Sequence, residues 1–297
     1  NDMAIIHELN LPPKRLLHKE PSPDFCKGSI FFVGTATVII RYGGFTILTD
    51  PNFLHAGDHV HLGYGLTSKR LTNPAIEIED LPPLDFCVLS HLHDDHFDRI
   101  AVEKLDKSLP ILTTPKAAAA LRLKGFRKPL ALDTWDVSRI TKGDSRVLLT
   151  AMPGRHAPGI LSSLLPPVMG SMLQFGALTG KGLFNLYISG DTLVFSDLKD
   201  IPRQFPDIDL ALMHLGGTKI LRLFTVTMDA EQGVEALRII RPSTAIPIHY
   251  NDYTVFRSPL GEFKRLVSRA GLPVEIVYLS HGDTYEFEVK ACEAKAA

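Results

Sequence analysis

The residues best suited to chemistry in this chain lie in the stretch "SHLHDDHFD", from Ser90 to Asp98. It holds three histidines and three aspartates in nine residues, and it directly follows the apolar run "LDFCVL". Imidazole nitrogens and carboxylate oxygens are ligands that zinc-like ions prefer in proteins. The stretch is therefore either half of a metal site or a polar loop that happens to be rich in histidine.

The spacing inside the stretch favours a metal site. His91 and His93 are two residues apart, so at the end of a strand their side chains point the same way. A turn beginning at Asp94 would bring Asp95 and His96 round to the same space. Two pairs of ligands would then face two neighbouring metal positions, each still short of the four or more donors that such an ion takes.

Three residues elsewhere in the chain can complete these positions. His156, Asp191 and His249 each follow an apolar run that is typical of a buried strand. Layered α/β folds place their sites where strand ends converge on one rim. We therefore expect His156, Asp191 and His249 to join the cluster as a third histidine, a bridging carboxylate and a fourth histidine.

The remaining pattern predicts strands alternating with a few helices. Strands are expected at residues 29–34, 37–42, 45–50, 85–90, 146–152, 171–177, 184–191, 208–217, 244–249, 274–279 and 284–289. Helices are expected at 99–107, 114–125, 227–240 with Thr227 as N-cap, and 258–271. Gly43 and Gly44 form the turn of a hairpin in an antiparallel meander at the front of the chain. Both halves read as strands followed by strand–helix units, which suggests two packed sheets.

The composition and the ends of the chain limit which classes of protein this can be. The chain has 297 residues, 45% hydrophobic and 22% charged, with a formal net charge of −1. Such a near-neutral balance without a basic stripe argues against a nucleic-acid partner. No apolar stretch is long enough to span a membrane, and the three separated cysteines fit a reducing, cytoplasmic location. Residues 1–28 are expected to form an irregular arm packed on one domain of residues 29–297, whose oligomeric state is not readable from the sequence.

Four motifs together resemble the ligand blocks of the metallo-β-lactamase superfamily. They are "HLHDDH", "GRHAPG", "ISGDT" and "IPIHYND", in that order. The front segment "FFVGTATVIIRYGGFTILTDP" is similar to the opening of one branch, which includes L-ascorbate-6-phosphate lactonases and N-acylphosphatidylethanolamine-hydrolysing phospholipase D. The resemblance covers about Ser29 to Asp283. It implies an α/β fold, a four-layer αββα sandwich of two mixed β-sheets flanked by helices.

The resemblance also implies a ligand set. His91, His93 and His156 would hold a first metal, Asp95, His96 and His249 a second, and Asp191 would bridge both. Asp50 would orient ligand side chains through imidazole N–H groups, whereas Asp94 stays unassigned. The expected cofactors are two divalent metal ions, zinc first, with manganese or iron as alternatives because such mixed sites accept all three.

The implied reaction is hydrolysis of a small ester, lactone or phosphodiester by a metal-bridging hydroxide. Asp95 could also steer this nucleophile. His214, at a strand end near the same rim, could bind the oxyanion or protonate a leaving group, or it could be a satisfied structural histidine. No serine-based catalytic triad is evident, which suits a mechanism without a covalent intermediate.

Rival functions remain on the same scaffold. They are a phospholipase-D-like phosphodiesterase on lipid headgroups, an RNA-processing nuclease, a di-iron redox enzyme and a non-catalytic protein. Near-neutral charge disfavours the nuclease. Di-iron members carry a glutamate where this chain has His93, and no ligand of the set is lost, so the last two are disfavoured as well.

The apolar segment 157–176 is either a buried connection or a hydrophobic lid, which would favour an apolar or acyl-bearing small-molecule substrate. His55, His59 and His61 lie in an unpatterned loop and are expected to be solvated, or else to line the pocket. Tyr250 and Asp252 follow His249 by one and three residues, so each could support a ligand side chain or face the substrate.

Overall fold

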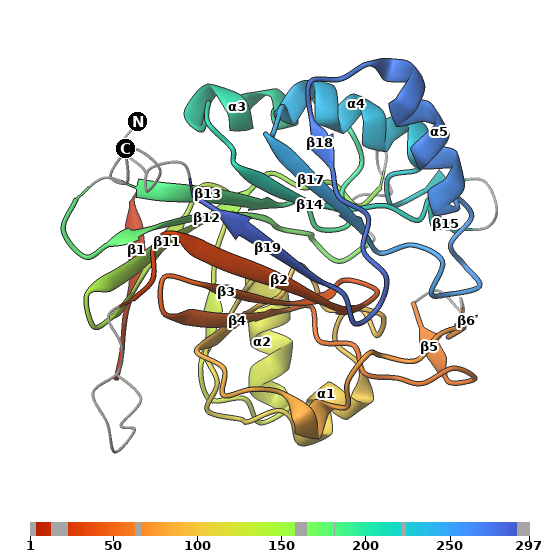
Figure 1. Ribbon diagram of the computed structural model, residues 1–297. Helices are drawn as coiled ribbons and strands as arrows, with labels where there is room; N and C mark the ends of the chain where they lie inside the picture. Colours follow the sequence, from red (N-terminus) through yellow and green to blue (C-terminus); the bar gives the residue numbers. More distant parts are fainter. Residues whose placement is uncertain are drawn as a thin grey trace.

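The computed structural model describes residues 4–12, 23–62, 67–157, 165–180, 182–220 and 224–289. Two mixed sheets pack face to face, with helices on their outer faces (Figure 1). The larger sheet has the order β1 (Ile5–Leu11), β10 (Val137–Lys142), β11 (Ser145–Met152), β12 (Gly170–Ala177), β13 (Gly182–Ile188), β14 (Leu210–His214), β17 (Thr244–Ile248) and β18 (Glu275–Ile276). The smaller has the order β19 (Thr284–Glu288), β2 (Lys27–Gly34), β3 (Thr37–Tyr42), β4 (Phe45–Thr49), β7 (Phe86–Val88), β8 (Ile111–Thr113) and β9 (Pro129–Ala131).

Three apolar clusters hold the four layers together. The central cluster joins the inner faces of the two sheets, where Tyr42 of β3 meets Phe175 of β12 edge to face at 5.2 Å between ring centroids. A second cluster packs α3 (Asp200–Gln204), α4 (Ala230–Ile240) and α5 (Leu260–Ala270) on the larger sheet. A third packs α1 (Arg99–Lys104) and α2 (Pro115–Leu123) on the smaller sheet. This αββα arrangement confirms the expected fold class.

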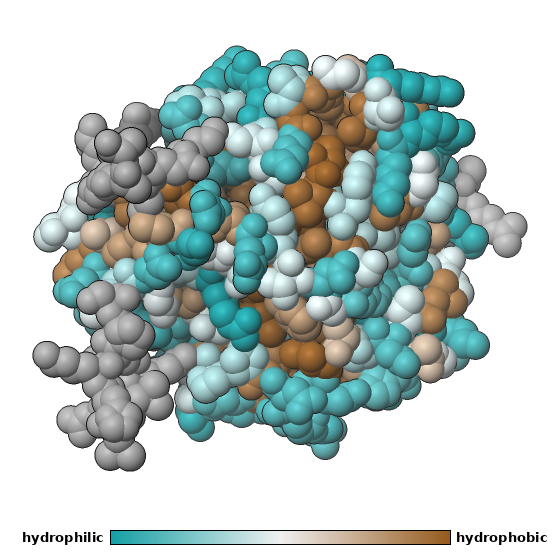
Figure 2. All heavy atoms as spheres, in the orientation of Figure 1, coloured by the Kyte–Doolittle hydropathy of each residue, from teal (hydrophilic) through white to brown (hydrophobic). Residues whose placement is uncertain are grey.

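The surface agrees with this layering. Figure 2 shows hydrophilic atoms over α5 and around α1, and a strip of hydrophobic atoms over the short edge strand β18. Among the described residues, no helix has both the length and the apolar character needed to cross a membrane.

Several expectations need correction. The irregular arm is wrong for Ile5–Leu11, which form strand β1 in parallel register with β10. Thr227 is not the N-cap of α4, because Asp229 accepts the capping hydrogen bond from the backbone N–H of Gln232. Cys87 is a buried free thiol, but Cys26 is disulfide-bonded, so the expectation of reduced cysteines is wrong there.

The strand ends place the site. β4 and β7 run parallel, as do β13, β14 and β17, so their carboxyl ends open on common edges of the two sheets. Asp50 and His249 lie just past β4 and β17 with φ of 31° and 61°. Such left-handed backbone costs a non-glycine residue on the order of 1–3 kcal/mol and concentrates at functional sites. Here it turns the chain sharply where a polar side chain must face the neighbouring strand ends.

Candidate metal centre

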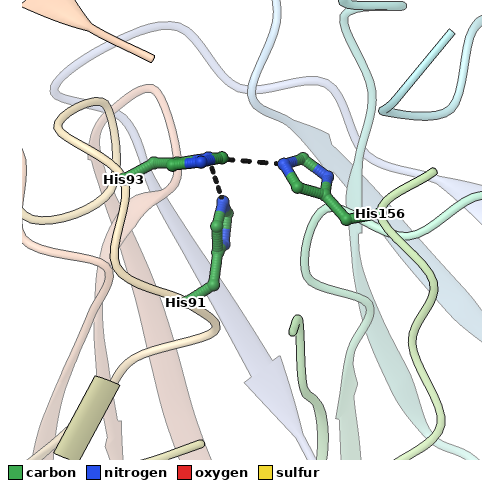
Figure 3. Close-up of side chains that lie close together, drawn as sticks. All are labelled: His91, His93 and His156. Carbon is green, nitrogen blue, oxygen red and sulfur yellow. Dashed lines mark hydrogen bonds between the residues drawn. The ribbon is translucent and has the colours of Figure 1, made fainter. Parts of the chain in front are cut away.

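The first donor cluster consists of His91, His93 and His156, which converge from two segments far apart in the sequence (Figure 3). His91 Nε2 lies 2.9 Å from His93 Nδ1, and His156 Nε2 lies 3.3 Å from the same atom. The three rings are almost fully enclosed, with His93 partly exposed. Three imidazole nitrogens therefore point at one small volume.

Hydrogen bonds behind the rings fix which nitrogens are free. His156 Nδ1 lies 2.8 Å from the carbonyl of Val226 and 3.0 Å from that of Asp191. A carbonyl only accepts, so Nδ1 carries the proton and Nε2 presents a lone pair. His91 Nδ1 lies 3.0 Å from Ser90 Oγ, which likewise leaves Nε2 toward the cluster.

Burial and neighbouring imidazoles keep these rings neutral. Burial, with the charges of the nearby histidines, holds the pKa of His91 well below its usual value. Burial and the charge of His156 lower the pKa of His93 to about 4. Burial also lowers the pKa of His156. Neutral imidazoles are the form that binds a metal ion.

The second donor cluster is Asp95, His96, Asp191 and His249, all buried. His96 Nε2 lies 3.2 Å from Asp191 Oδ2, and His249 Nε2 lies 3.5 Å from Asp95 Oδ2. Four ligand-type atoms of this cluster are buried without a hydrogen-bond partner: Asp95 Oδ1, His96 Nε2, Asp191 Oδ1 and His249 Nε2. Buried polar atoms are almost always satisfied, so this concentration points to a missing partner.

Opposite charges shape the protonation of this cluster. Burial alone would lower the pKa of His96, but the carboxylates of Asp191, Asp95 and Asp50 hold it well above its usual value. Burial would raise the pKa of Asp191, but His249 and His96 hold it well below its usual value. The carboxylates are therefore ionised and the pocket favours positive charge.

Asp50 supports both clusters from behind. Its Oδ2 lies 2.8 Å from His96 Nδ1, 2.8 Å from Ser90 Oγ and 3.4 Å from His214 Nε2, and its Oδ1 accepts from Ser90 N–H at 2.7 Å. Burial raises the pKa of Asp50, but His96 and His214 outweigh it and lower the pKa to about 2. A carboxylate with several N–H and O–H donors orients ligand rings in the way that metal centres require.

The donor sets fit divalent cations. One offers three neutral imidazole nitrogens, and the other offers two imidazoles and two carboxylates, which suits zinc and equally manganese or iron. The seven predicted ligands, His91, His93, Asp95, His96, His156, Asp191 and His249, all belong to these two sets. Buried ligand-type atoms without hydrogen-bond partners are the donors that a divalent cation would satisfy.

His214 does not line the pocket in which a catalytic group would have to act. Its ring is fully buried and stacks on His96 at 6.0 Å between centroids. Nε2 faces Asp50 and Nδ1 lies 3.3 Å from Ser189 Oγ. It does not line the pocket described below, so the contacts favour the alternative of a satisfied buried histidine that supports Asp50.

The donor clusters open into a pocket of about 280 Å³, counting its open mouth. The described residues that line it are Leu62, His93, Asp95, His156, Asp191, Thr218 and Val226. His55, His59 and His61 are not among them, and His59 and His61 are exposed, as expected for solvated loop residues. The pocket therefore meets both donor clusters through their most accessible members.

The segment 157–176 is in part a core strand. Residues Gly170–Ala177 form β12, which pairs with β11 and β13 inside the larger sheet, so the lid expectation is wrong for that part. Ala157 and Leu165 are buried against Val226 of the pocket wall. Residues 158–164 lie outside the described part of the chain.

Three supporting residues escaped sequence reasoning. Thr227 Oγ1 donates to Asp191 Oδ2 at 2.9 Å, Ser90 links Asp50 to His91, and Thr218 lines the pocket. The sequence places all three residues near the ends of predicted strands. Threonine and serine are so common at such positions that this placement alone does not indicate a supporting role. Tyr250 donates to the carbonyl of Leu279, away from the clusters.

Asp252 supports the turn that carries His249. Its Oδ2 accepts from Thr35 N–H at 2.9 Å, and its Oδ1 lies 3.0 Å from His281 Nε2. The carbonyl of Thr35 in turn accepts from His249 N–H at 2.6 Å. Asp252 therefore supports His249 indirectly, through the backbone of Thr35, and this support is one of the two roles expected for Asp252.

Comparisons with known proteins agree with this centre. Residues 46–250 match the family model described as "Beta-lactamase superfamily domain". A protein of Staphylothermus marinus named UPF0173 metal-dependent hydrolase is 33% identical over 204 residues, covering 69% of this chain and 78% of the relative. A protein of the same name from Natranaerobius thermophilus is 30% identical over 217 residues, covering 72% of this chain and 86% of the relative.

A solved structure gives the same fold. The isothiocyanate hydrolase from Delia radicum gut bacteria superposes with a TM-score of 0.73 at 21% identity, covering 88% of this chain and 99% of that chain. The matched region, 46–250, contains Asp50 and all seven ligand-type residues of the two clusters. The chain is therefore a metal-dependent hydrolase and belongs to the metallo-β-lactamase superfamily.

Proposed function

We propose that this chain is a binuclear hydrolase that acts on a small ester, lactone or phosphodiester. His91, His93 and His156 would hold one divalent cation, Asp95, His96 and His249 the other, and Asp191 would serve both. When bound, two such cations supply Lewis acidity and a hydroxide at neutral pH. Zinc is the first expectation, with manganese or iron as alternatives.

The observation that carries this proposal is the set of buried ligand-type atoms without partners. Four such atoms lie in the second cluster. In the first cluster, His91 Nε2 and His156 Nε2 lie 2.9 Å and 3.3 Å from His93 Nδ1. One proton can join only two of these three nitrogens, so a metal cation satisfies all of their lone pairs better. Two separate sets of donors support two ions better than one.

The chain's own residues would act as follows. Asp95 lines the pocket, and its buried Oδ1 can accept a hydrogen bond from an attacking water and orient it. Thr227 holds the Asp191 carboxylate through Oδ2, which leaves Oδ1 free for a ligand role. Asp50, supported by His214, fixes His96 with its Nε2 toward the cluster.

Finer assignments belong to the same proposal. The front segment of the sequence resembles the branch that includes L-ascorbate-6-phosphate lactonases and N-acylphosphatidylethanolamine-hydrolysing phospholipase D. This resemblance supports an ester or phosphodiester bond as the target. A phosphodiesterase on lipid headgroups is the alternative within this branch, and an RNA-processing nuclease is disfavoured by the net charge of −1. A cytoplasmic location is part of the proposal as well.

Metal analysis joined to a substrate panel tests the proposal. Protein purified without added metal is analysed for bound ions, then assayed on lactones, 4-nitrophenyl esters, bis(4-nitrophenyl) phosphate, a β-lactam and a small isothiocyanate. We expect close to two ions per chain and hydrolysis of at least one ester, lactone or phosphodiester. The variant His91→Ala should lose an ion and nearly all activity, while His55→Ala, an exposed histidine outside both clusters, should keep both. Full activity of His91→Ala on every substrate would refute the mechanism.

A further inference from the structure

Beyond the ligand-type residues, the described part of the pocket wall consists of Leu62, Thr218 and Val226. Leu62 belongs to an apolar cluster with Leu54, Val60, Tyr253 and Val255. Val226 belongs to a different cluster, with Ala157 and Leu165. Two independent apolar clusters therefore extend to the pocket, and each fixes its wall residue from behind.

Thr218 is placed by a tight turn of two glycines. Gly216 and Gly217, with φ of 107° and 58°, follow His214 at the end of β14 and redirect the chain. A Cβ on Gly216 would come within 2.6 Å of the carbonyl of His249, so only glycine allows this close approach. The turn sets Thr218 at the start of a short hairpin of β15 (Lys219–Ile220) and β16 (Phe224–Thr225).

The backbone of Thr218 is tied down while its hydroxyl is free. Its carbonyl accepts from Val226 N–H at 2.9 Å, and the carbonyl of Val226 accepts from His156 Nδ1 at 2.8 Å. The residues that the structure describes provide no hydrogen-bond partner for the Thr218 hydroxyl. A rigidly held, unpartnered hydroxyl at the lip of a reaction pocket is suited to binding a polar atom of the substrate.

The charges around the pocket select among substrates. The charged side chains among its described lining residues are Asp95 and Asp191, both in the metal-ligand set. An anionic group on the part of a substrate away from the reacting bond would find no described cation there. Removing such a charge from water without a partner is costly, whereas an uncharged apolar group gains by burial.

Resting on the proposed function, we infer that the substrate is a small ester or lactone whose non-reacting part is uncharged and apolar. That part would pack on Leu62 and Val226. The Thr218 hydroxyl would bond a polar atom of the substrate next to the reacting carbonyl. Thr218 is thus assigned as a substrate-binding residue that determines specificity.

A matched pair of esters tests the inference on the unaltered, metal-loaded enzyme. The probes are 4-nitrophenyl hexanoate and the mono-4-nitrophenyl ester of adipic acid, which share the reacting bond and the chain length but differ by a terminal carboxylate. We expect kcat/KM to be higher for the hexanoate by roughly tenfold or more. A preference for the adipate ester would overturn the inference while leaving the hydrolase proposal intact. Hydrolysis of a phosphodiester but of no ester or lactone would overturn the inference alone, and hydrolysis of none of the three by enzyme with two ions bound would overturn both.

Variants at Thr218 test the hydroxyl separately. Thr218→Val keeps the shape and the backbone bond to Val226 but removes the hydroxyl, whereas Thr218→Ser keeps the hydroxyl. With metal content unchanged, Thr218→Val should lower kcat/KM for the hexanoate by roughly tenfold, and Thr218→Ser should stay near the unaltered enzyme. Equal activity of the two variants would refute the assignment of Thr218.

One further variant addresses a basic residue in the segments next to the pocket that the structure does not describe. Residues 63–66, 158–164 and 221–223 adjoin described residues of the pocket region, and Arg222 is the basic residue that they contain. Arg222→Gln should leave the preference for the hexanoate unchanged. A preference for the adipate ester that disappears in Arg222→Gln would identify an anion-binding pocket and overturn the inference.

Discussion

Asp50 Oδ2 and His96 Nδ1 lie 2.8 Å apart, both fully buried, and this contact joins the front of the smaller sheet to the metal centre. Asp50 directly follows β4, and His96 lies in the turn after β7. Every group that bonds to Asp50 at this point is a donor: Ser90 N–H, Ser90 O–H and the rings of His96 and His214. The carboxylate is therefore the one side chain of this size that satisfies them all.

Asp50→Asn should weaken metal binding. The amide NH₂ cannot accept a hydrogen bond, so at least one donor loses its partner and the His96 ring is free to turn. We expect a loss of about 10- to 100-fold in metal affinity, measured by competition with a chromogenic chelator. Asp94→Asn is the matched control, because it makes the same change next to Asp95, and Asp94 bonds instead to the backbone N–H of His61. Equal affinities of the two variants would show that Asp50 does not orient the ligand.

Thr227→Val should reduce activity through Asp191. The Thr227 hydroxyl donates to Asp191 Oδ2 at 2.9 Å and so fixes the direction of Oδ1. Without it the carboxylate can rotate, and we expect kcat to fall by about tenfold or less, since one neutral-to-charged hydrogen bond is lost. Thr227→Ser should retain activity. A loss of similar size in both variants would indicate that any change of shape at this position lowers activity, and it would contradict the proposed role of the hydroxyl.

The fold class, and the residues that gather in the two donor clusters, could be predicted from the sequence because apolar runs and polar motifs alternate sharply along the chain. Apolar runs such as Thr37–Tyr42 coincide with strands, and the ligand-type residues lie in the turns after such strands, from one to eight residues past the strand end. Strand β1 escaped prediction because its residues alternate between exposed and half-buried at a sheet edge. Its apolar signal is correspondingly weak.

The supporting shell of the site could not be read from the sequence. The contact between Thr227 and Asp191 spans 36 residues and depends on the hairpin between β14 and α4. The same kind of threonine before a helix is typical of an N-cap, which is the role that Asp229 has instead. The direction of the His214 ring likewise follows from the packing of β14 beside β13, which no local pattern encodes.

Asp252 should make stability depend on pH in acid. Burial raises its pKa, but His281, Arg70 and Thr72 outweigh this and lower the pKa below its usual value. A lowered pKa means that the ionised form stabilises the fold above about pH 4, and that this contribution is lost as pH falls through the folded pKa. Asp252→Asn should therefore cost about 1–3 kcal/mol at pH 7, with the difference from the unaltered protein shrinking below pH 4.

Urea unfolding of both proteins at several pH values measures this difference. Asp144→Asn, which removes an exposed carboxylate, is the control and should change the free energy of unfolding little at any pH. A constant deficit of Asp252→Asn from pH 7 to pH 3 would contradict the electrostatic explanation and leave a purely steric one.

Removal of the metal ions should lower thermal stability. The metal-free centre keeps two ionised carboxylates and several unpartnered donor atoms buried together, and bound cations would satisfy them. Ions that bind only the folded state stabilise it by about 2.7 kcal/mol when present at about 100 times their Kd. For a chain of 297 residues, such a change corresponds to a shift in Tm of roughly 4 °C per ion. Calorimetry before and after chelation, followed by re-addition of one and then two equivalents of zinc, would measure this shift.

We expect Tm to recover in two steps in the unaltered protein and in one step in His91→Ala, because that variant retains only the Asp95, His96, Asp191 and His249 cluster. Recovery in a single step at one equivalent in both proteins would mean that the two donor clusters hold one ion between them.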